Sequence, residues 1–160
     1  MDVVRTAFAG KLPPAALPDY FDEVFEAFRG AGAWALFEDT RACLERLRAG
    51  GRRLAVISNF DSRLFDVLAN LGIDSCFEQV ILSWHVGAAK PDPAIFRRAL
   101  DAMNTDAASA WHVGDSPDED AAGAMAAGLG AVLVDRDGNH CGWDAGTRIG
   151  SLLELPGWLP

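Results

Sequence analysis

Residues 110–134 read AWHVGDSPDEDAAGAMAAGLGAVLV and contain a strand, an acidic turn, a helix and a second strand in succession. The apolar runs at 110–113 and 131–134 have the length of buried strands. The alanine-rich stretch 118–127 stops at Gly128, which is typical of a helix that ends at a glycine. This spacing predicts two parallel strands joined by a helical crossover.

The same alternation extends back to residue 40. Helices are expected at 40–49, 63–71 and 93–103, and a short one at 151–155 after a glycine-rich loop. The remaining strands are expected at 54–57 and 79–83. The sequence therefore predicts an α/β fold, a Rossmann-like parallel sheet with helices on both faces. Its strands should end at Ser58, Ser83, Val113 and Val134.

Residues 1–33 differ from the rest of the chain. Phe21, Val24, Phe25 and Phe28 have the spacing of an amphipathic helix, and prolines precede that stretch. We therefore divide the chain into a helical segment at 1–33 and an α/β core at 34–160.

Composition limits the kinds of partner. The chain of 160 residues has a formal net charge of −9, which argues against nucleic acid because phosphate contacts need clustered Lys and Arg. No apolar run approaches the roughly 18–20 residues of a membrane span. The three cysteines lack metal-ligand spacing and are expected to be free thiols. We expect a cytoplasmic protein whose partner is a small anionic metabolite; the sequence does not indicate an oligomeric state.

Polar residues follow the first two strands at the sheet edge where parallel sheets bind ligands. Ser58 and Asn59 can donate hydrogen bonds to phosphate oxygens, although Ser58 could equally cap the next helix. Lys90 precedes a Pro-x-Pro turn at 91–93, where a stiff backbone would hold its ammonium in place. The alternative for Lys90 is an ordinary solvated lysine.

The third strand is followed by an acidic turn at 115–120. Its carboxylates could hold a hard cation such as Mg²⁺. Acidic residues also belong in the first turn of a helix, which accounts for 118–120 without a metal. That explanation does not cover Asp115, which comes before the turn.

Taken in order, these segments resemble a known family. Residues 55–59 (AVISN), 90–96 (KPDPAIF) and 113–116 (VGDS) with Asp120 resemble the second, third and fourth motifs of the haloacid dehalogenase superfamily. Order and spacing are similar to those of members with a helical cap, and 1–33 resembles the C-terminal part of that cap.

The resemblance implies a phosphatase-type hydrolysis of a small phosphorylated metabolite, through an aspartyl intermediate and with Mg²⁺ as cofactor. Ser58 and Asn59 would bind the phosphate, with Asn59 acting through its backbone. Lys90 would be catalytic, orienting the nucleophile and neutralising charge. Asp115 would bind Mg²⁺ directly, and Asp120 would support the metal indirectly, through a water molecule or a hydrogen bond.

One motif of that family is not found where the resemblance requires it. The nucleophile belongs to an Asp-x-Asp that follows a central first strand, and no such segment precedes Ser58. Asp135-Arg136-Asp137 matches the Asp-x-Asp pattern, but it lies where the family places its last core strand. We therefore reject it as the nucleophile motif. We expect a truncated chain, inactive alone. Two alternatives are that the neighbouring strands close up or that a partner supplies a strand.

Two other functions compete with the phosphatase hypothesis. Dehalogenation of a 2-haloacid needs no metal, and the acidic cluster around Asp115 argues against it. A binding or interaction module that keeps the fold without the chemistry is the other alternative.

Overall fold

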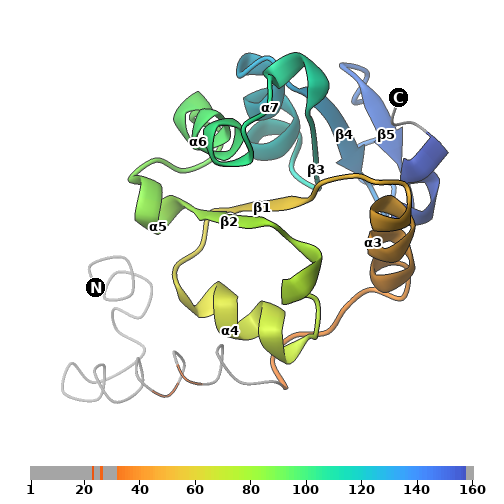
Figure 1. The fold of residues 1–160 in the computed structure, drawn as a ribbon. Coiled ribbons are helices and arrows are strands. Elements are labelled where there is room, and N and C mark those ends of the chain that lie inside the picture. The colour runs from red at the N-terminus through yellow and green to blue at the C-terminus, as the bar shows by residue number, and fades with distance from the viewer. Residues whose placement is uncertain (1–22, 24–25, 27–31, 158–160) are drawn as a thin grey trace, which may run out of the picture.

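The computed structural model describes residues 23, 26 and 32–157 (Figure 1). The strands are β1 (Ala55–Ser58), β2 (Gln79–Leu82), β3 (Trp111–Gly114), β4 (Gly130–Val134) and β5 (Thr147–Ile149). The helices are α3 (Thr40–Ala49), α4 (Arg63–Asn70), α5 (Ser83–Val86), α6 (Pro93–Met103) and α7 (Gly123–Ala126). A π-helical segment, Pro117–Ala122, precedes α7, and short 3₁₀ turns occupy Asp74–Cys76, Ala107–Ser109 and Leu152–Gly157.

All strand pairs in the described part of the chain are parallel. β1 pairs with β2, with Ala55 opposite Gln79, and β4 lies between β3 and β5. These pairs form two separate sheets, β1–β2 and β3–β4–β5. The prediction of a parallel α/β fold is confirmed, and the sheet is divided between β1 and β3, where the resemblance places a further strand.

Helices cover both sides of the strands. In Figure 1, α6 and α7 lie above them and α3 and α4 lie below. β4 shows the consequence in its alternating side chains: Ala131 packs with Phe96 of α6, while Val132 packs with Cys43 of α3 on the other side. Burial on both faces explains why this strand is an uninterrupted apolar run.

The helix signals in the sequence agree well with the observed helices. α6 begins at Pro93, and the Asp92 side chain accepts a hydrogen bond from the Ala94 N–H at 2.9 Å. The helix ends at Met103 and is capped by Asn104, which adopts a left-handed conformation with φ 45°. Proline at the first position and a left-handed residue at the end are the expected boundaries of a helix.

Three elements differ from the sequence prediction. β5 and α5 were not predicted, because a three-residue strand and a four-residue helix carry no measurable periodicity. The predicted helix at 118–127 begins as the π-helical segment and becomes α-helical only at Gly123. The strand ends are accurate to one residue, since β2 ends at Leu82 and β3 at Gly114.

The amphipathic helix expected around 21–28 lies outside the described residues, apart from Glu23 and Glu26, which are helical. The division of the chain at residue 33 therefore stays a prediction. Among the described residues, no helix is both long enough and apolar enough to cross a membrane.

Candidate active site at the strand ends

Loops that follow β1 and β2 are joined by the side chain of Asn59. Its Oδ1 accepts a hydrogen bond from the Lys90 N–H at 2.7 Å, and its Nδ2 donates to the Lys90 carbonyl oxygen at 3.0 Å. Nδ2 also donates to a Glu119 carboxylate oxygen at 3.0 Å. Glu119 belongs to the segment after β3, so one amide holds three strand-end loops together.

Asp120 is the centre of the site. It is only 3% exposed, and its Oδ1 contacts Lys90 Nζ at 2.5 Å and His112 Nε2 at 2.8 Å. Its Oδ2 accepts a hydrogen bond from the Ser116 N–H at 3.0 Å. Both oxygens are thus satisfied by the protein, as a buried carboxylate requires.

The surroundings of Asp120 determine its ionisation. Burial by itself would raise the pKa of this carboxyl group, but the hydrogen bonds from His112 and Lys90 outweigh it. The Ser116 N–H adds to them, and together they hold the pKa of Asp120 well below its usual range. Asp120 is therefore ionised at neutral pH and forms an ion pair with the half-buried Lys90 side chain.

Backbone geometry after β3 brings Asp120 into this position. A Cβ atom on Gly114 would collide with the Asp120 carboxylate, so only glycine permits the approach. The following π-helical turn, in which the Ala121 N–H bonds to the Ser116 carbonyl oxygen at 3.1 Å, is wider than an α-helical turn. Ser116 caps it by accepting a hydrogen bond from the Glu119 N–H at 3.1 Å.

Ser58 and Asp115 lie at the ends of β1 and β3. Ser58 is half-buried as the last residue of β1, and Asp115 is exposed directly after β3. The structure thus places both at the edge where Lys90 and Asp120 meet. Their phosphate- and metal-binding roles, and that of Lys90, stay predictions.

The donors available for a cation are few. Within the described part of the chain, no three His, Cys, Asp or Glu side chains are arranged to hold a metal ion. Both oxygens of Asp120 have protein partners, which leaves Asp115 as an exposed carboxylate. Mg²⁺ takes one or two carboxylates together with water and substrate phosphate. The described residues therefore fit one ligand of a magnesium site and do not complete it.

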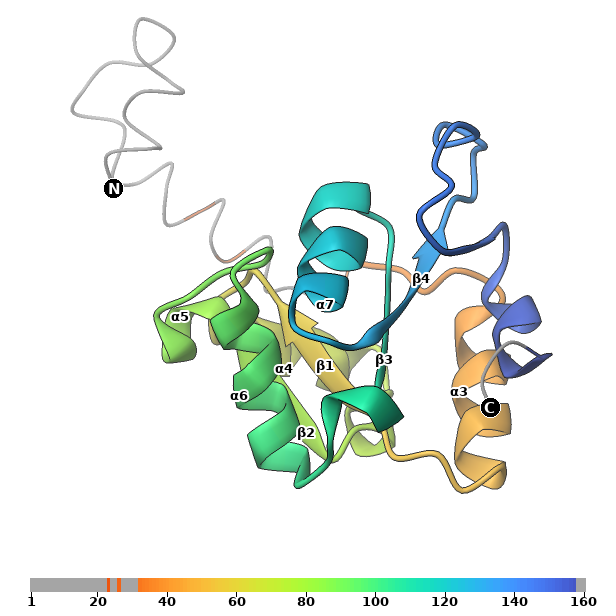
Figure 2. The same ribbon diagram turned by 90° about the horizontal axis from the view of Figure 1, so that it is seen from above.

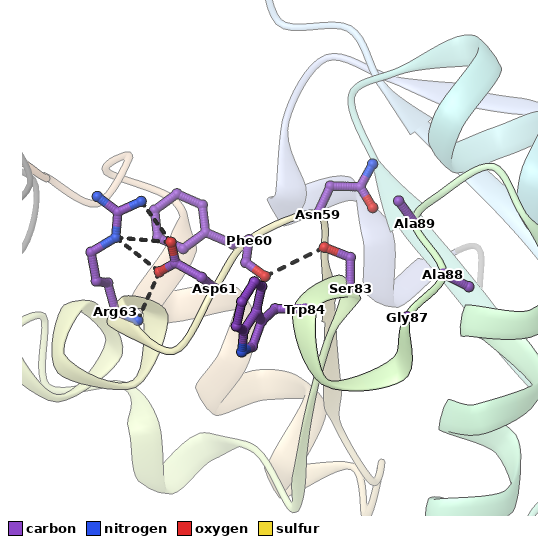
Figure 3. Close-up of a pocket in the computed structure, with 9 residues that line it drawn as sticks. All are labelled: Asn59, Phe60, Asp61, Arg63, Ser83, Trp84, Gly87, Ala88 and Ala89. Carbon is purple, nitrogen blue, oxygen red and sulfur yellow. Dashed lines mark hydrogen bonds and ion pairs between the residues drawn. The ribbon is translucent and has the colours of Figure 1, made fainter. Parts of the chain in front are cut away.

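A surface pocket of about 670 Å³ lies beside Asn59 (Figure 3). Asp61 and Arg63 form one side of it, joined by a 2.7 Å ion pair, and Ala88 and Ala89 form the other. Trp84 lines the pocket and is 74% exposed. A cation and a large aromatic ring next to the strand ends could contact the body of a small anionic substrate.

The sequence pattern did not indicate three of these residues. His112 sits inside an apolar strand, where a lone histidine gives no motif, and its role appears only through its contact with Asp120. Arg63 and Trp84 carry no spacing signal either. Their neighbours in the pocket come from segments far apart in the chain.

The rejected Asp135 turn is used in a different way. Asp135 is 6% exposed, and its Oδ2 accepts hydrogen bonds from Arg148 Nη1 at 2.7 Å and from the His140 N–H at 3.1 Å. Burial opposes ionisation, but these hydrogen bonds keep the pKa of Asp135 lowered. Asp135 ties β4 to β5 and the intervening loop.

A parallel α/β layer with a lysine and carboxylates converging at its strand ends defines a Rossmann-like domain with a candidate ligand site at that edge. The sequence pattern of the haloacid dehalogenase-like hydrolase family matches residues 4–128. The chain belongs to this family, and the resemblance seen in its motifs is confirmed.

Relatives with curated descriptions agree with this family membership. The mouse (Mus musculus) haloacid dehalogenase-like hydrolase domain-containing protein 3 is 41% identical over 83% of this chain and 54% of its own length. A phosphoserine phosphatase of Thermus thermophilus is 38% identical over 74% of this chain and 49% of its own length. The chain thus spans about half the length of these relatives.

A solved structure has the same fold. The 2-haloacid dehalogenase from Pseudomonas syringae is 33% identical with a TM-score of 0.73, and the match covers 91% of this chain and 63% of that one. Family and fold are therefore shared by proteins named for two different reactions.

Proposed function

We propose that this chain forms the phosphate-binding, charge-neutralising part of a Mg²⁺-dependent phosphatase that acts on a small phosphorylated metabolite through an aspartyl intermediate. The observation that supports it most is the Asn59–Lys90–Asp120 network, which fixes a lysine ammonium where three strand-end loops meet. A fixed, half-buried positive charge next to an open pocket suits a phosphoryl group.

Each residue has a distinct task in this proposal. The Ser58 hydroxyl and the Asn59 N–H donate to phosphoryl oxygens. Lys90 neutralises charge that builds up on them, and Asp120 keeps its ammonium oriented. Mg²⁺, when bound, would supply further charge neutralisation, with Asp115 as its ligand from this chain.

The attacking carboxylate is not assigned to a residue of this chain. No Asp-x-Asp precedes Ser58, and Asp135 is engaged with Arg148. We therefore expect the isolated chain to bind phosphate without turning over phosphomonoesters, because the covalent route needs that carboxylate.

Titration calorimetry with inorganic phosphate tests the binding part of the proposal. Lys90→Met keeps the aliphatic stem and should weaken binding by about tenfold or more, since a charge-assisted contact contributes about 1.5–3 kcal/mol. Arg98→Met removes an exposed charge of α6 and is the matched control, with affinity expected to be unchanged. Equal affinities of both variants would remove Lys90 from the site.

Turnover of a generic phosphomonoester tests the chemistry. We expect no turnover by this chain with Mg²⁺, and turnover once an upstream strand ending in Asp-x-Asp is added. Asp115→Ala in the extended chain should then lower the rate by about a hundredfold or more, as loss of a metal ligand does. Release of halide from a 2-haloacid by the extended chain without metal, surviving Asp115→Ala, would favour the dehalogenase-type reaction. Phosphate binding that never yields turnover would favour the binding module.

A further inference from the structure

The pocket beside Asn59 contains an unusually exposed aromatic ring. Trp84 lines the pocket and is 74% exposed, and no other ring in the described part of the chain pairs with it. A single exposed ring elsewhere on the surface would need no explanation. Here the ring belongs to a cavity of about 670 Å³, which is within the size range of small-molecule sites.

The short helix α5 holds Trp84 at this place. α5 begins directly after β2 and ends at Gly87, whose φ of 75° is left-handed and favours glycine. The Ser83 hydroxyl donates a hydrogen bond to the Phe60 carbonyl oxygen at 3.4 Å, which joins α5 to the loop after β1. Both ribbon views place α5 at the periphery of the described chain (Figure 1, Figure 2). The indole is therefore presented to solvent from a backbone that is anchored to the core.

Small residues leave room beside the indole. Gly87, Ala88 and Ala89 line the pocket, and the chain continues from them directly into Lys90. Figure 3 shows Trp84 between Ala88 and Ala89 on one side and the Asp61–Arg63 pair on the other. Larger side chains at 87–89 would fill this space. A flat group can therefore lie against the ring.

The charged residues of the pocket neutralise each other. Arg63 Nη2 lies 2.7 Å from Asp61 Oδ2, and Arg63 Nε lies 2.8 Å from Asp61 Oδ1. These hydrogen bonds lower the pKa of Asp61, so both side chains are charged and their charges cancel. The described lining contains no further charged residue. The pocket therefore offers a ligand an aromatic surface and no net charge.

The pocket adjoins the proposed phosphate site. Asn59 lines the pocket, and its side chain holds the Lys90 backbone through hydrogen bonds of 2.7 and 3.0 Å. Ala89, which also lines the pocket, directly precedes Lys90. A ligand whose phosphoryl group is held by Lys90 would extend its remaining part into the pocket.

We propose that this pocket binds the body of the substrate and selects an uncharged aromatic ring that stacks on Trp84. The substrate class is then an aromatic phosphomonoester, and a phosphomonoester whose body is a carboxylate is disfavoured. Stacking is favourable because the indole offers a large flat face from which the ligand ring displaces water. The inference rests on the proposed function, since that function puts the phosphoryl group at Lys90.

Calorimetric titration of the full chain with matched ligands tests this preference. Phenyl phosphate should bind about fivefold or more tighter than inorganic phosphate, as expected for stacking on an aromatic side chain. Cyclohexyl phosphate has a similar size without a flat ring, and phosphoglycolate has a carboxylate in place of the ring. Both should bind more weakly than phenyl phosphate. Equal affinities for phenyl phosphate and cyclohexyl phosphate would overturn the stacking role of Trp84.

Variants locate the ring. Trp84→Ala should bring the affinities for phenyl phosphate and inorganic phosphate together, while Trp84→Phe should retain part of the difference. Phe37→Ala is the matched control, because Phe37 is 64% exposed and does not line the pocket. Ala88→Leu fills the opposite side of the pocket and should also abolish the preference. A preference that survives both Trp84→Ala and Ala88→Leu would overturn the proposal.

Asp61→Asn tests the charge argument. This variant leaves Arg63 without its counter-charge, so the affinity for phosphoglycolate should rise several-fold, and the gain should shrink in salt. An unchanged affinity for phosphoglycolate would contradict the placement of the substrate body beside the Asp61–Arg63 pair.

A ring without phosphate separates this inference from the proposed function. Phenol should shift the NMR signal of the Trp84 indole N–H, which is identified by its absence in Trp84→Phe. If inorganic phosphate does not bind to the parent chain, the proposed function fails and the substrate class fails with it, whether or not phenol binds. If inorganic phosphate binds but neither phenol nor phenyl phosphate shifts the Trp84 signal, only this inference is overturned.

Discussion

Asp120 and Asp135 are the two buried acidic residues of the described chain, and both follow strands of the same sheet. Asp120 shares one oxygen between Lys90 and His112, whose side chains are 13% and 10% exposed. Asp135 pairs with Arg148, whose side chain is 35% exposed. Asp120 thus holds a half-buried ammonium near the pocket, and Asp135 links β4 to β5 through Arg148. Sequence position alone does not separate these uses, because the partner determines what the charge can do.

The two sites should differ most in how much stability is lost when the carboxylate is removed. Asp120→Ala leaves the half-buried Lys90 ammonium without its counter-charge and His112 without a hydrogen-bond partner, so the free energy of unfolding should fall by about 3–5 kcal/mol. Urea denaturation measures this loss of stability. Asp120→Asn keeps the shape of the side chain and should lose less stability. A loss below about 1 kcal/mol would mean that Lys90 finds water or another partner.

Gly114 tests the approach of Asp120 to β3. Gly114→Ala places a Cβ against the carboxylate and should cost about 1–3 kcal/mol, the range of overpacked sites. Gly142→Ala is the matched control, because nothing lies within 4 Å of its Cβ position. Its unfolding free energy should stay within about 0.5 kcal/mol of the parent. Equal stabilities of the two variants would contradict the close approach.

Acid should reveal the ionised state of Asp120. Its pKa is lowered in the folded protein, so its stabilisation is complete above the unfolded pKa of about 4 and is lost as pH falls below it. The slope from this group approaches about 1.4 kcal/mol per pH unit there. Asp120→Asn should flatten the acid limb of stability against pH. Parallel curves for the parent and Asp120→Asn would show that Asp120 is not the group responsible.

Asp135→Ala should have the smallest effect. Arg148 regains water when its partner is removed, so we expect less than a third of the stability loss of Asp120→Ala. Phosphate affinity should be unchanged, measured by the titration used for Lys90→Met. Loss of phosphate binding in Asp135→Ala would return the Asp135 turn to the candidate site.

The sequence by itself determined the order of elements and the residues at the strand ends. α3 and α6 have the predicted bounds, because their apolar spacing and glycine or proline boundaries are local signals. Ser58, Asn59, Lys90 and Asp115 could be selected because the carboxyl ends of parallel strands share one edge, and Asp120 was added by the resemblance to the family. Family membership followed from the same segments and is confirmed.

Only the tertiary structure decided how those residues are used. Asn59 holds the Lys90 backbone with its side chain, and His112 joins Asp120 from within a strand. The cavity lined by residues of β1 and β3 also exists only in three dimensions, between segments that lie more than fifty residues apart in the chain. Periodicity and capping are set by neighbours along the chain. Charge pairing, close approach and unpaired strand edges depend on residues that only folding brings together.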